Sequence, residues 1–376
     1  MKLALVIGSL GGGGAERVMA TLANAWVQRG VTVTLITIDD VCADRYPLDS
    51  RIERIGLGLR RNSVRGWQKL ANNYQRVRAL RAALRTTHPD GILSFLPTTN
   101  VLSVLAARSL KIPVVLSERI SPEHDQHPMA WRALRAFTYR RAAAMTIQTE
   151  RGAVWMKHHI PDVPVRVIPN PVQIEDETLD AVARCVVSNC RDQNILLAVG
   201  RLDVQKGFDL LLRAFASVIA DHPDWRLVIL GEGPERYVIE AQMRELGLTE
   251  RVSLPGFSST PQALMRHSQL FVLSSRFEGF PNALLEAMAC GIPCVSFDCP
   301  TGPAELITDG IDGLLVPPQD TRALAGALGR LMDAPSLRDR LGHAAQVAAS
   351  AYSLDSILAR WNALLETSGI ICDKHG

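Results

Sequence analysis

Short apolar runs alternate with helical stretches along the whole chain, and this alternation constrains the fold most. The residues in these runs are mostly Val, Ile, Leu and Ala, as in strands buried on both faces of a parallel sheet. In the first half they lie at 3–7, 31–38, 91–95, 114–117, 145–148 and 165–168. Between them, stretches such as 15–29 place apolar residues on one helical face. The pattern predicts βα repeats, and therefore a parallel sheet covered by helices.

The same pattern restarts after a break near residue 170. Six further apolar runs lie at 196–199, 226–230, 252–254, 270–273, 294–297 and 313–316. A length of 376 residues fits two domains. We expect an α/β protein with two tandem Rossmann-like domains, at 1–170 and 171–352, and a C-terminal helix over 353–376 that packs back across them. Such domains would face each other across a ligand-binding cleft at the carboxyl ends of their strands.

Charge is distributed unevenly between the two halves. Residues 1–180 carry 24 Lys and Arg against 16 Asp and Glu, whereas the rest carries 17 against 22. This indicates an anionic partner for the first half. An aromatic content of 5% and the absence of a recognised motif argue against nucleic acid. No signal peptide or membrane-spanning run is evident, which predicts a cytoplasmic chain. None of the seven cysteines forms a C-x-x-C pair, so we expect no metal.

Two loops that each follow an expected strand are suited to phosphate. Gly11–Gly14 opens a helix, where backbone N–H groups and the helix dipole favour an anion. Its spacing matches neither a dinucleotide fingerprint nor a Walker A loop, and a flexible turn remains the alternative. In Gly200–Gly207, Arg201 and Lys206 suit a diphosphate, with a solvated loop as the alternative.

The segment 276–287 carries two carboxylates beside a predicted helix start. Glu278 follows the strand at 270–273, and Pro281 and Asn282 begin the helix that contains Glu286. Carboxylates in these positions suit the hydroxyls of a sugar or ribose. The alternative is a helix-dipole partner and a surface residue.

These three segments, in this order, resemble the retaining glycosyltransferases of the GT-B fold in the large family 4. Glu278 and Glu286, with seven residues between them, are similar to that family's paired-glutamate signature. The resemblance covers nearly the whole chain. It is strongest to enzymes that extend lipid-linked oligosaccharides, including the N-acetylgalactosaminyltransferases of bacterial protein N-glycosylation.

The resemblance implies a role for each matching residue. Arg201, Lys206 and Glu278 would be catalytic: the cations would hold the departing diphosphate and Glu278 the sugar hydroxyls, while Glu286 would bind the ribose. Other donor-binding residues would be Gly13, Gly14, Phe257, Gly279, Phe280, Pro281 and Asn282. Arg119 stands where many relatives carry histidine, so a sugar contact and a structural role both remain open.

No separate nucleophile is evident, which favours a front-face mechanism in which the leaving diphosphate deprotonates the acceptor. Cations would then supply the electrostatic stabilisation, without metal or cofactor. No D-x-D suited to a metal is present, and His124–His127 lacks the glutamate of a zincin helix.

The segment 60–85 places basic residues among apolar ones at helical spacing, as in an interfacial helix. Arg61, Arg65, Lys69 and Arg76 would face an anionic membrane or a polyprenyl-diphosphate acceptor. A core-packed helix with a solvated basic face is the alternative.

The combined prediction is a retaining transferase at the inner face of the cytoplasmic membrane. It would move a hexose or N-acetylhexosamine from a UDP-sugar onto a polyprenyl-diphosphate-linked or other membrane-anchored glycan, in bacterial surface polysaccharide or glycoprotein glycan assembly. The alternatives are a GDP-mannose-dependent transferase, a nucleotide-sugar 2-epimerase, and a non-catalytic nucleotide-sugar-binding subunit.

Overall fold

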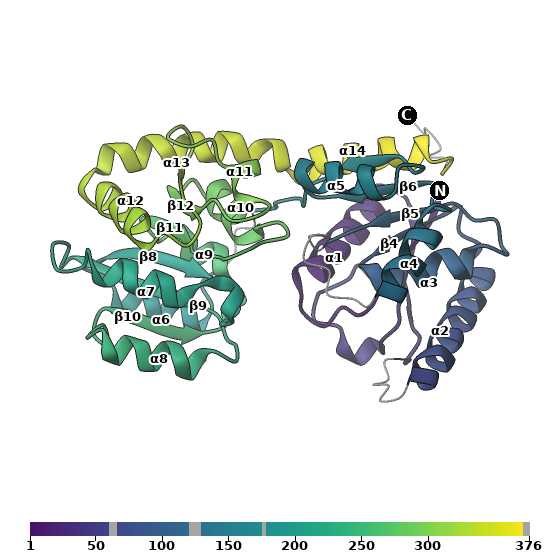
Figure 1. The fold of residues 1–376 in the computed structure, drawn as a ribbon, viewed down its shortest axis with the longest axis horizontal. Coiled ribbons are helices and arrows are strands. Elements are labelled where there is room, and N and C mark those ends of the chain that lie inside the picture. The colour runs from purple at the N-terminus through teal and green to yellow at the C-terminus, as the bar shows by residue number, and fades with distance from the viewer. Residues whose placement is uncertain (60–65, 120–128, 175–177, 371–376) are drawn as a thin grey trace. The chain divides into compact units, whose positions relative to one another are not determined.

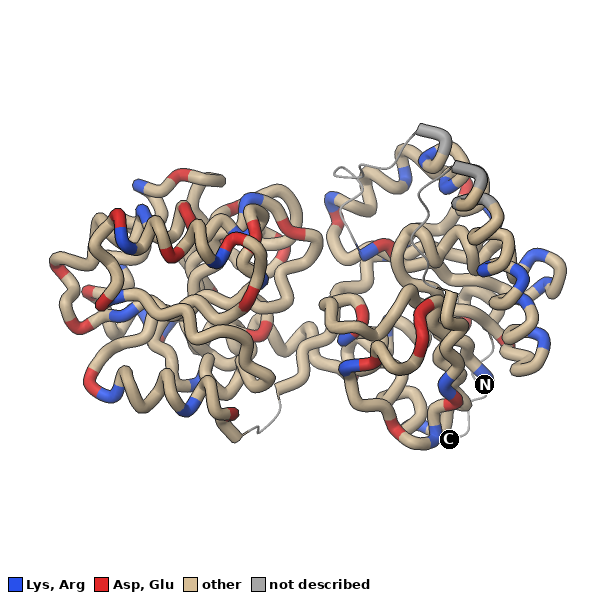
Figure 2. The backbone as a smooth tube through the Cα atoms, turned by 90° about the horizontal axis from the view of Figure 1, so that it is seen from below, with Lys and Arg blue, Asp and Glu red and all other residues tan. Residues whose placement is uncertain are grey.

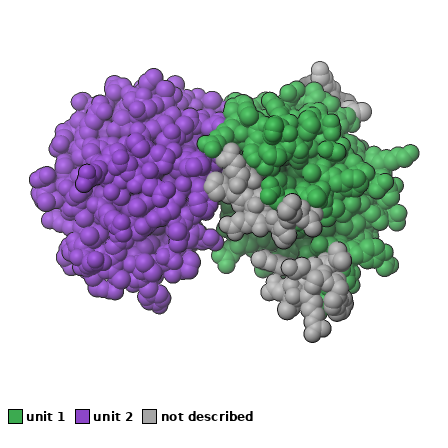
Figure 3. All heavy atoms as spheres, in the orientation of Figure 1, with its two compact units in different colours: residues 1–170, 355–376 green, residues 171–354 purple. Residues whose placement is uncertain are grey.

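The computed structural model describes residues 1–59, 66–119, 129–174 and 178–370. The chain forms two compact units (Figures 1 and 3). Unit 1 contains residues 1–170 together with 355–376, and unit 2 contains residues 171–354. Unit 1 is therefore discontinuous in sequence, because the last helix returns to it.

Unit 1 is built on a seven-stranded parallel sheet in the order β3-β2-β1-β4-β5-β6-β7. The strands are β1 Lys2–Ile7, β2 Thr32–Thr37, β3 Glu53–Gly56, β4 Gly91–Phe95, β5 Val114–Ser117, β6 Ala144–Ile147 and β7 Val165–Val167. All six runs predicted in this half are strands. The prediction lacks β3, an edge strand with the half-exposed sequence Glu-Arg-Ile-Gly, which has no apolar run.

Helices cover both faces of this sheet. They are α1 Gly14–Gln28, α2 Gly66–Thr87, α3 Pro97–Ala107, α4 Met129–Tyr139, α5 Glu150–His159 and α14 Leu354–Thr367. Ala4, Val6 and Ile92 pack with α2 to α5 on one face. Side chains alternate along a strand, so Phe95 points to the other face, where its ring stacks on Trp361 of α14. The Trp26 indole of α1 donates a hydrogen bond to Asn362 of α14.

Unit 2 repeats the plan with six parallel strands in the order β10-β9-β8-β11-β12-β13. The strands are β8 Asn194–Val199, β9 Trp225–Leu230, β10 Val252–Gly256, β11 Leu270–Leu273, β12 Cys294–Phe297 and β13 Leu314–Val316. The helices are α6 Ala181–Asn189, α7 Phe208–Ala216, α8 Arg236–Glu245, α9 Pro261–Met265, α10 Asn282–Ala289, α11 Pro303–Leu306, α12 Thr321–Asp333 and α13 Pro335–Ala349. Leu196 and Ala198 pack into one apolar layer, and Ile195 and Leu197 into the other. Two parallel-sheet Rossmann-like units confirm the predicted fold class.

Strand order locates the ligand-binding edge of each sheet. In unit 2 the chain builds β8, β9 and β10 toward one edge and then returns to place β11 on the other side of β8. The order reverses in the same way at β1 and β4 in unit 1. Ligands of doubly wound sheets bind outside the carboxyl ends of the strands at such a reversal. In unit 2 this point lies between the loops that follow β8 and β11.

Candidate functional site

A lysine and a glutamate meet where the strand order of unit 2 reverses. Lys206 Nζ lies 2.6 Å from Glu278 Oε1. Lys206 ends the 3-10 turn η3 (Val204–Lys206) after β8, and Glu278 lies in the loop after β11. The Glu278 residue is 5% exposed, and Ser275 Oγ donates to the same Oε1 at 2.6 Å. The second oxygen, Oε2, accepts no hydrogen bond from a described residue, so it is the atom left for a ligand hydroxyl.

The loop after β8 is shaped by a cap and a glycine. Asp203 Oδ1 accepts from the backbone N–H of Lys206 at the start of η3. Gly207 follows with φ +62°, and a Cβ there would collide with the carbonyl oxygen of Ser274. The glycine therefore allows the end of η3 to lie against the loop after β11. Ser274 Oγ in turn donates to the Lys206 carbonyl at 2.9 Å.

Further bonds join the same two loops. The backbone N–H of Arg276 donates to the Gln205 carbonyl at 2.8 Å, and Gln205 Nε2 donates to the Phe277 carbonyl at 3.0 Å. The guanidinium of Arg276 forms a bidentate pair with Asp209, at 2.8 Å for each bond, which lowers the pKa of the Asp209 carboxyl. The Lys206–Glu278 pair thus sits on a cross-linked frame, as precise positioning of a ligand requires.

Arg201 has a different environment from Lys206. Its side chain is 72% exposed, and its Nε pairs with Asp203 Oδ2 at 2.6 Å. Nη1 and Nη2 make no hydrogen bond with a described residue. The structure therefore leaves the terminal nitrogens of Arg201 accessible but does not place them against Glu278.

The segment before α10 presents backbone donors beside the pair. Gly279 and Phe280 precede Pro281, and their N–H groups make no hydrogen bond with any described residue. Phe280 is buried and packs near Tyr352, with ring centroids 6.3 Å apart. N–H groups at a helix N-terminus are suited to an anion. Asn282 is the first residue of α10.

Two other predicted donor residues lie outside the two loops that hold this pair. Glu286 is a buried residue of α10, so the surface-residue alternative is wrong for it. Phe257 is 70% exposed directly after β10, two strands from β8 at the same edge of the sheet.

The glycine-rich loop of unit 1 follows β1 at the reversal point of that sheet. Gly13 is the N-cap of α1 and Gly14 its first residue. A Cβ at Gly13 would collide with the Glu16 carboxylate, and the Gly13 carbonyl accepts from Tyr46 Oη at 3.0 Å. Because this carboxylate is the end of a flexible side chain and can move, the loop conformation does not itself require glycine at this position.

Arg119 is buried after β5, with 8% exposure. Its guanidinium carbon lies 3.8 Å from the ring centroid of Phe95 and 5.8 Å from that of Trp361. Nη1 donates to Asn170 Oδ1, whereas Nε and Nη2 have no hydrogen-bond partner among the described residues. Burial lowers the pKa of Arg119 to about 9. The stacking fits a structural role, and the two unsatisfied donors fit a ligand contact.

Most of the predicted basic face lies beyond what the structure describes. Arg61, Arg65 and the His124–His127 segment fall outside the described residues, and the side chain of Lys69 in α2 is not described either. Arg76 is half-buried: its Nε donates to the Leu59 carbonyl at 3.1 Å, and burial lowers its pKa.

Sequence reasoning missed the residues that support the site. Asp203, Gln205 and Ser275 were not singled out, although an Asp three residues before Lys206 is a recognisable capping signal. Searches of the described ranges reveal no cluster of three or more metal-ligating side chains. Within these ranges, no helix has both the length and the apolar character needed to cross a membrane.

Comparison with known proteins defines the class. The family model of glycosyltransferase family 4 matches residues 12–176, and that of the group 1 glycosyl transferases matches residues 187–347. An alpha-D-kanosaminyltransferase of Streptomyces kanamyceticus is 31% identical over 78% of this chain and 81% of its own length. The chain therefore belongs to the glycosyltransferases of the GT-B fold.

Two further relatives match over nearly the full length. One is a Campylobacter jejuni enzyme, 29% identical over 97% of this chain and 98% of its own. Its name describes an N-acetyl-D-galactosaminyltransferase acting on a GalNAc-containing, PP-undecaprenol-linked glycan. The other is the crystal structure of Anabaena HepE in complex with UDP and glucose, which superposes with a TM-score of 0.79 at 19% identity. It covers 98% of this chain and 100% of HepE, and at this identity it supports the fold alone.

Proposed function

We propose that this glycosyltransferase transfers a hexose or N-acetylhexosamine, with retention of configuration, from a UDP-sugar to a polyprenyl-diphosphate-linked or other membrane-anchored glycan. The Lys206–Glu278 pair at the strand-order reversal of unit 2 carries the proposal. The Campylobacter jejuni relative, named for a lipid-linked acceptor, supports the acceptor class. Unit 2 would bind the donor and unit 1 the acceptor, at the inner face of the cytoplasmic membrane, as part of bacterial surface polysaccharide or glycoprotein glycan assembly.

The pair has the chemistry that a departing diphosphate and a donor sugar need. The Lys206 ammonium and the exposed Arg201 guanidinium would neutralise the charge that develops on the diphosphate. Glu278 Oε2 would accept from a sugar hydroxyl, while Oε1 stays bound to Lys206 and Ser275. The free N–H groups of Gly279 and Phe280 would add donors to a phosphate oxygen.

Charge stabilisation by side chains makes a metal unnecessary for this step. The bond from the anomeric carbon to the diphosphate breaks, and the acceptor oxygen bonds to that carbon from the same face. The acceptor proton passes to the diphosphate oxygen, which needs no further base. Glu278 serves as an orienting group in this scheme and not as a nucleophile.

Thermal unfolding in the presence of UDP, GDP, ADP or their common nucleotide-sugars tests which nucleotide the donor carries. A ligand that binds only the native state, at 100 times its Kd, stabilises that state by about 2.7 kcal/mol. A shift with UDP and one UDP-sugar is expected, and a shift with GDP alone would overturn the UDP assignment. Absence of any shift would favour a non-catalytic subunit. Transfer in the presence of EDTA, with the anomeric configuration of the product read by NMR, tests the metal-free retaining step.

A further inference from the structure

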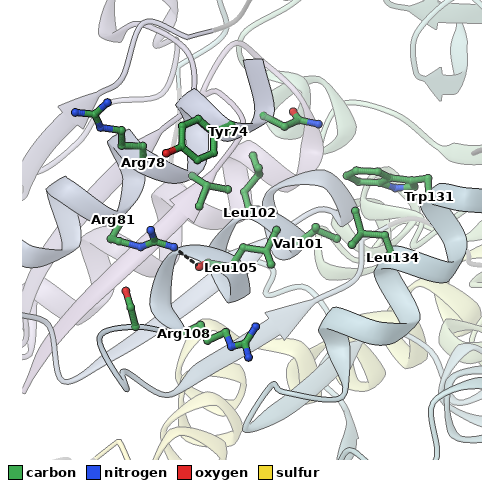
Figure 4. Close-up of a pocket in the computed structure, with 12 residues that line it drawn as sticks. Tyr74, Arg78, Arg81, Val101, Leu102, Leu105, Arg108, Trp131 and Leu134 are labelled. Atoms are coloured by element: carbon green, nitrogen blue, oxygen red, sulfur yellow. Dashed lines mark hydrogen bonds between the residues drawn. The ribbon is translucent and has the colours of Figure 1, made fainter. Parts of the chain in front are cut away.

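Unit 1 contains an apolar cavity that the proposed chemistry does not use. Its volume is about 590 Å³, and it lies between α2, α3 and α4 (Figure 4). These three helices pack side by side on one face of the sheet. The apolar side chains that line the cavity are Val77, Val101, Leu102, Leu105, Trp131 and Leu134.

Arginines stand around this apolar lining. Arg78 and Arg108 are exposed, and neither side chain forms a hydrogen bond or ion pair with a described residue. Arg81 instead donates to the carbonyls of Leu105 and Ala106, and so caps the C-terminal end of α3 (Figure 4). Tyr74, at the rim beside Arg78, is 70% exposed. The cavity therefore combines an apolar interior with two unpaired cations at its rim.

The surrounding helices give these cations no acidic counterpart. The sequences of α2, α3 and α4 contain no Asp or Glu. Figure 2 shows Lys and Arg positions, in blue, recurring along the helices of unit 1. An exposed apolar patch with a rim of unpaired positive charge fits an occupant that is anionic at one end and hydrocarbon at the other.

We propose that this cavity takes one acyl chain of an anionic phospholipid, with Arg78 and Arg108 each free to pair with an anionic headgroup at the rim. The inference rests on the proposed membrane-anchored acceptor, and it identifies where unit 1 contacts the leaflet. Long arginine side chains can keep the guanidinium at the headgroups while their stems follow apolar surface. Leu134, which lines the cavity, is itself exposed, and so is Phe137 one turn further along α4.

The cavity lies toward the end of α3 that is far from the ligand-binding edge of the sheet. α3 begins at Pro97, just after the carboxyl end of β4, and Arg108 follows its last residue. Eleven helical residues span about 16 Å, so Arg108 lies far along the helix from the edge where ligands of the sheet bind. A phosphate at Arg108 would therefore lie well away from that edge.

Co-sedimentation of the protein with vesicles tests whether Arg78 and Arg108 bind anionic lipid. The vesicles contain phosphatidylcholine, alone or mixed with phosphatidylglycerol, and no polyprenyl lipid. The R78Q/R108Q variant should bind the anionic vesicles about 25-fold more weakly, since each cation contributes about fivefold. The matched R322Q/R330Q variant, which removes two exposed arginines of α12 in unit 2, should bind as the wild type does. Equal binding by both double variants would overturn the proposal.

Quenching by brominated acyl chains tests the cavity itself. Trp131 lines it, so bromine on an inserted chain should quench part of the tryptophan emission. This part should disappear in Trp131→Phe and shrink in Val77→Phe, which fills part of the cavity without adding a tryptophan. Unfolding curves check that both variants fold. Quenching unchanged in Trp131→Phe would show that no chain enters.

Two outcomes keep this inference separate from the proposed transfer reaction. Vesicle binding that requires added polyprenyl diphosphate would assign the cavity to the acceptor and overturn the bulk-lipid proposal. Transfer to a water-soluble acceptor fragment measures the reaction without a membrane. Loss of that transfer in a folded R78Q/R108Q variant would likewise assign these arginines to the acceptor site. Failure of the wild type to transfer would contradict the proposed function and leave the vesicle results intact.

Discussion

Glu278 accepts hydrogen bonds from Lys206 and Ser275 at Oε1, whereas Oε2 accepts none from a described residue. Replacing Glu278 should therefore affect transfer more than stability. Glu278→Gln keeps the shape and an acceptor for Lys206 but removes the negative charge. We expect the transfer rate to fall about 100-fold or more, because the neutral amide no longer orients the sugar hydroxyl as the carboxylate does. The fold should lose only about 1–2 kcal/mol, because one neutral hydrogen bond to Lys206 remains. Initial rates and denaturant unfolding measure the two quantities.

Glu250→Gln is the matched control, because Glu250 is an exposed carboxylate of the same unit. It should leave both rate and stability within the error of the wild type. Wild-type turnover by Glu278→Gln would contradict the assignment of the site.

At Arg119 the two alternatives left open by the sequence predict opposite results. Arg119→Met retains an apolar stem between Phe95 and Trp361 and removes a buried charge with two unsatisfied donors. Replacing a buried, incompletely paired ion by an apolar side chain is often neutral or stabilising. If Nε and Nη2 bind ligand, kcat/KM should fall at least about tenfold while the melting temperature stays level or rises. A lower melting temperature with normal kcat/KM would assign Arg119 to structure alone.

At the scale of elements, apolar runs predicted every described strand except the edge strand β3. All six strands of unit 2 lie at predicted runs, because buried parallel strands must be apolar on both faces. The edge strand β3 has a charged residue at each of its first two positions and was missed. The residues of the site also differ in how far the sequence predicted them. Lys206 and Glu278 were predicted from local motifs, whereas the contact of Ser275 with Glu278 depends on loop geometry that no spacing rule gives.

The turn between η3 and α7 is the element on which the site geometry depends. Gly207→Ala would add a Cβ against the Ser274 backbone in a residue with φ +62°. The loop must then move, which should separate Lys206 from Glu278. We expect a loss of about 2–4 kcal/mol from strain and collision together. Transfer should be nearly abolished, as measured by initial rates.

Gly310→Ala separates collision from strain. Gly310 has φ +74°, but a Cβ there would meet nothing within 4 Å. It should cost only the left-handed penalty, about 1–2 kcal/mol, and leave the transfer rate unchanged. Equal effects of the two variants on the rate would show that the Gly207 turn does not position Lys206.

At the scale of the whole molecule, the last helix completes the first unit. α14 belongs to unit 1 although the whole of unit 2 precedes it in sequence. Its apolar period predicts a helix, and we expected it to pack back across the domains, but amphipathic spacing does not say which surface it covers. Trp361 against Phe95 and Asn362 against Trp26 identify that surface. We therefore expect the stability of unit 1 to depend on α14.

Trp361→Ala tests this dependence, because Trp361 is fully buried. Truncating a buried tryptophan costs about 3–5 kcal/mol, and here the loss should fall on unit 1. Hydrogen exchange should accelerate in β1, β4 and α1, while β8 and β11 keep their protection. Tyr237→Ala, at an 81% exposed residue of unit 2, should change neither unit by more than about 0.5 kcal/mol. Equal loss of protection in both units would mean that they unfold as one cooperative body, contrary to this expectation.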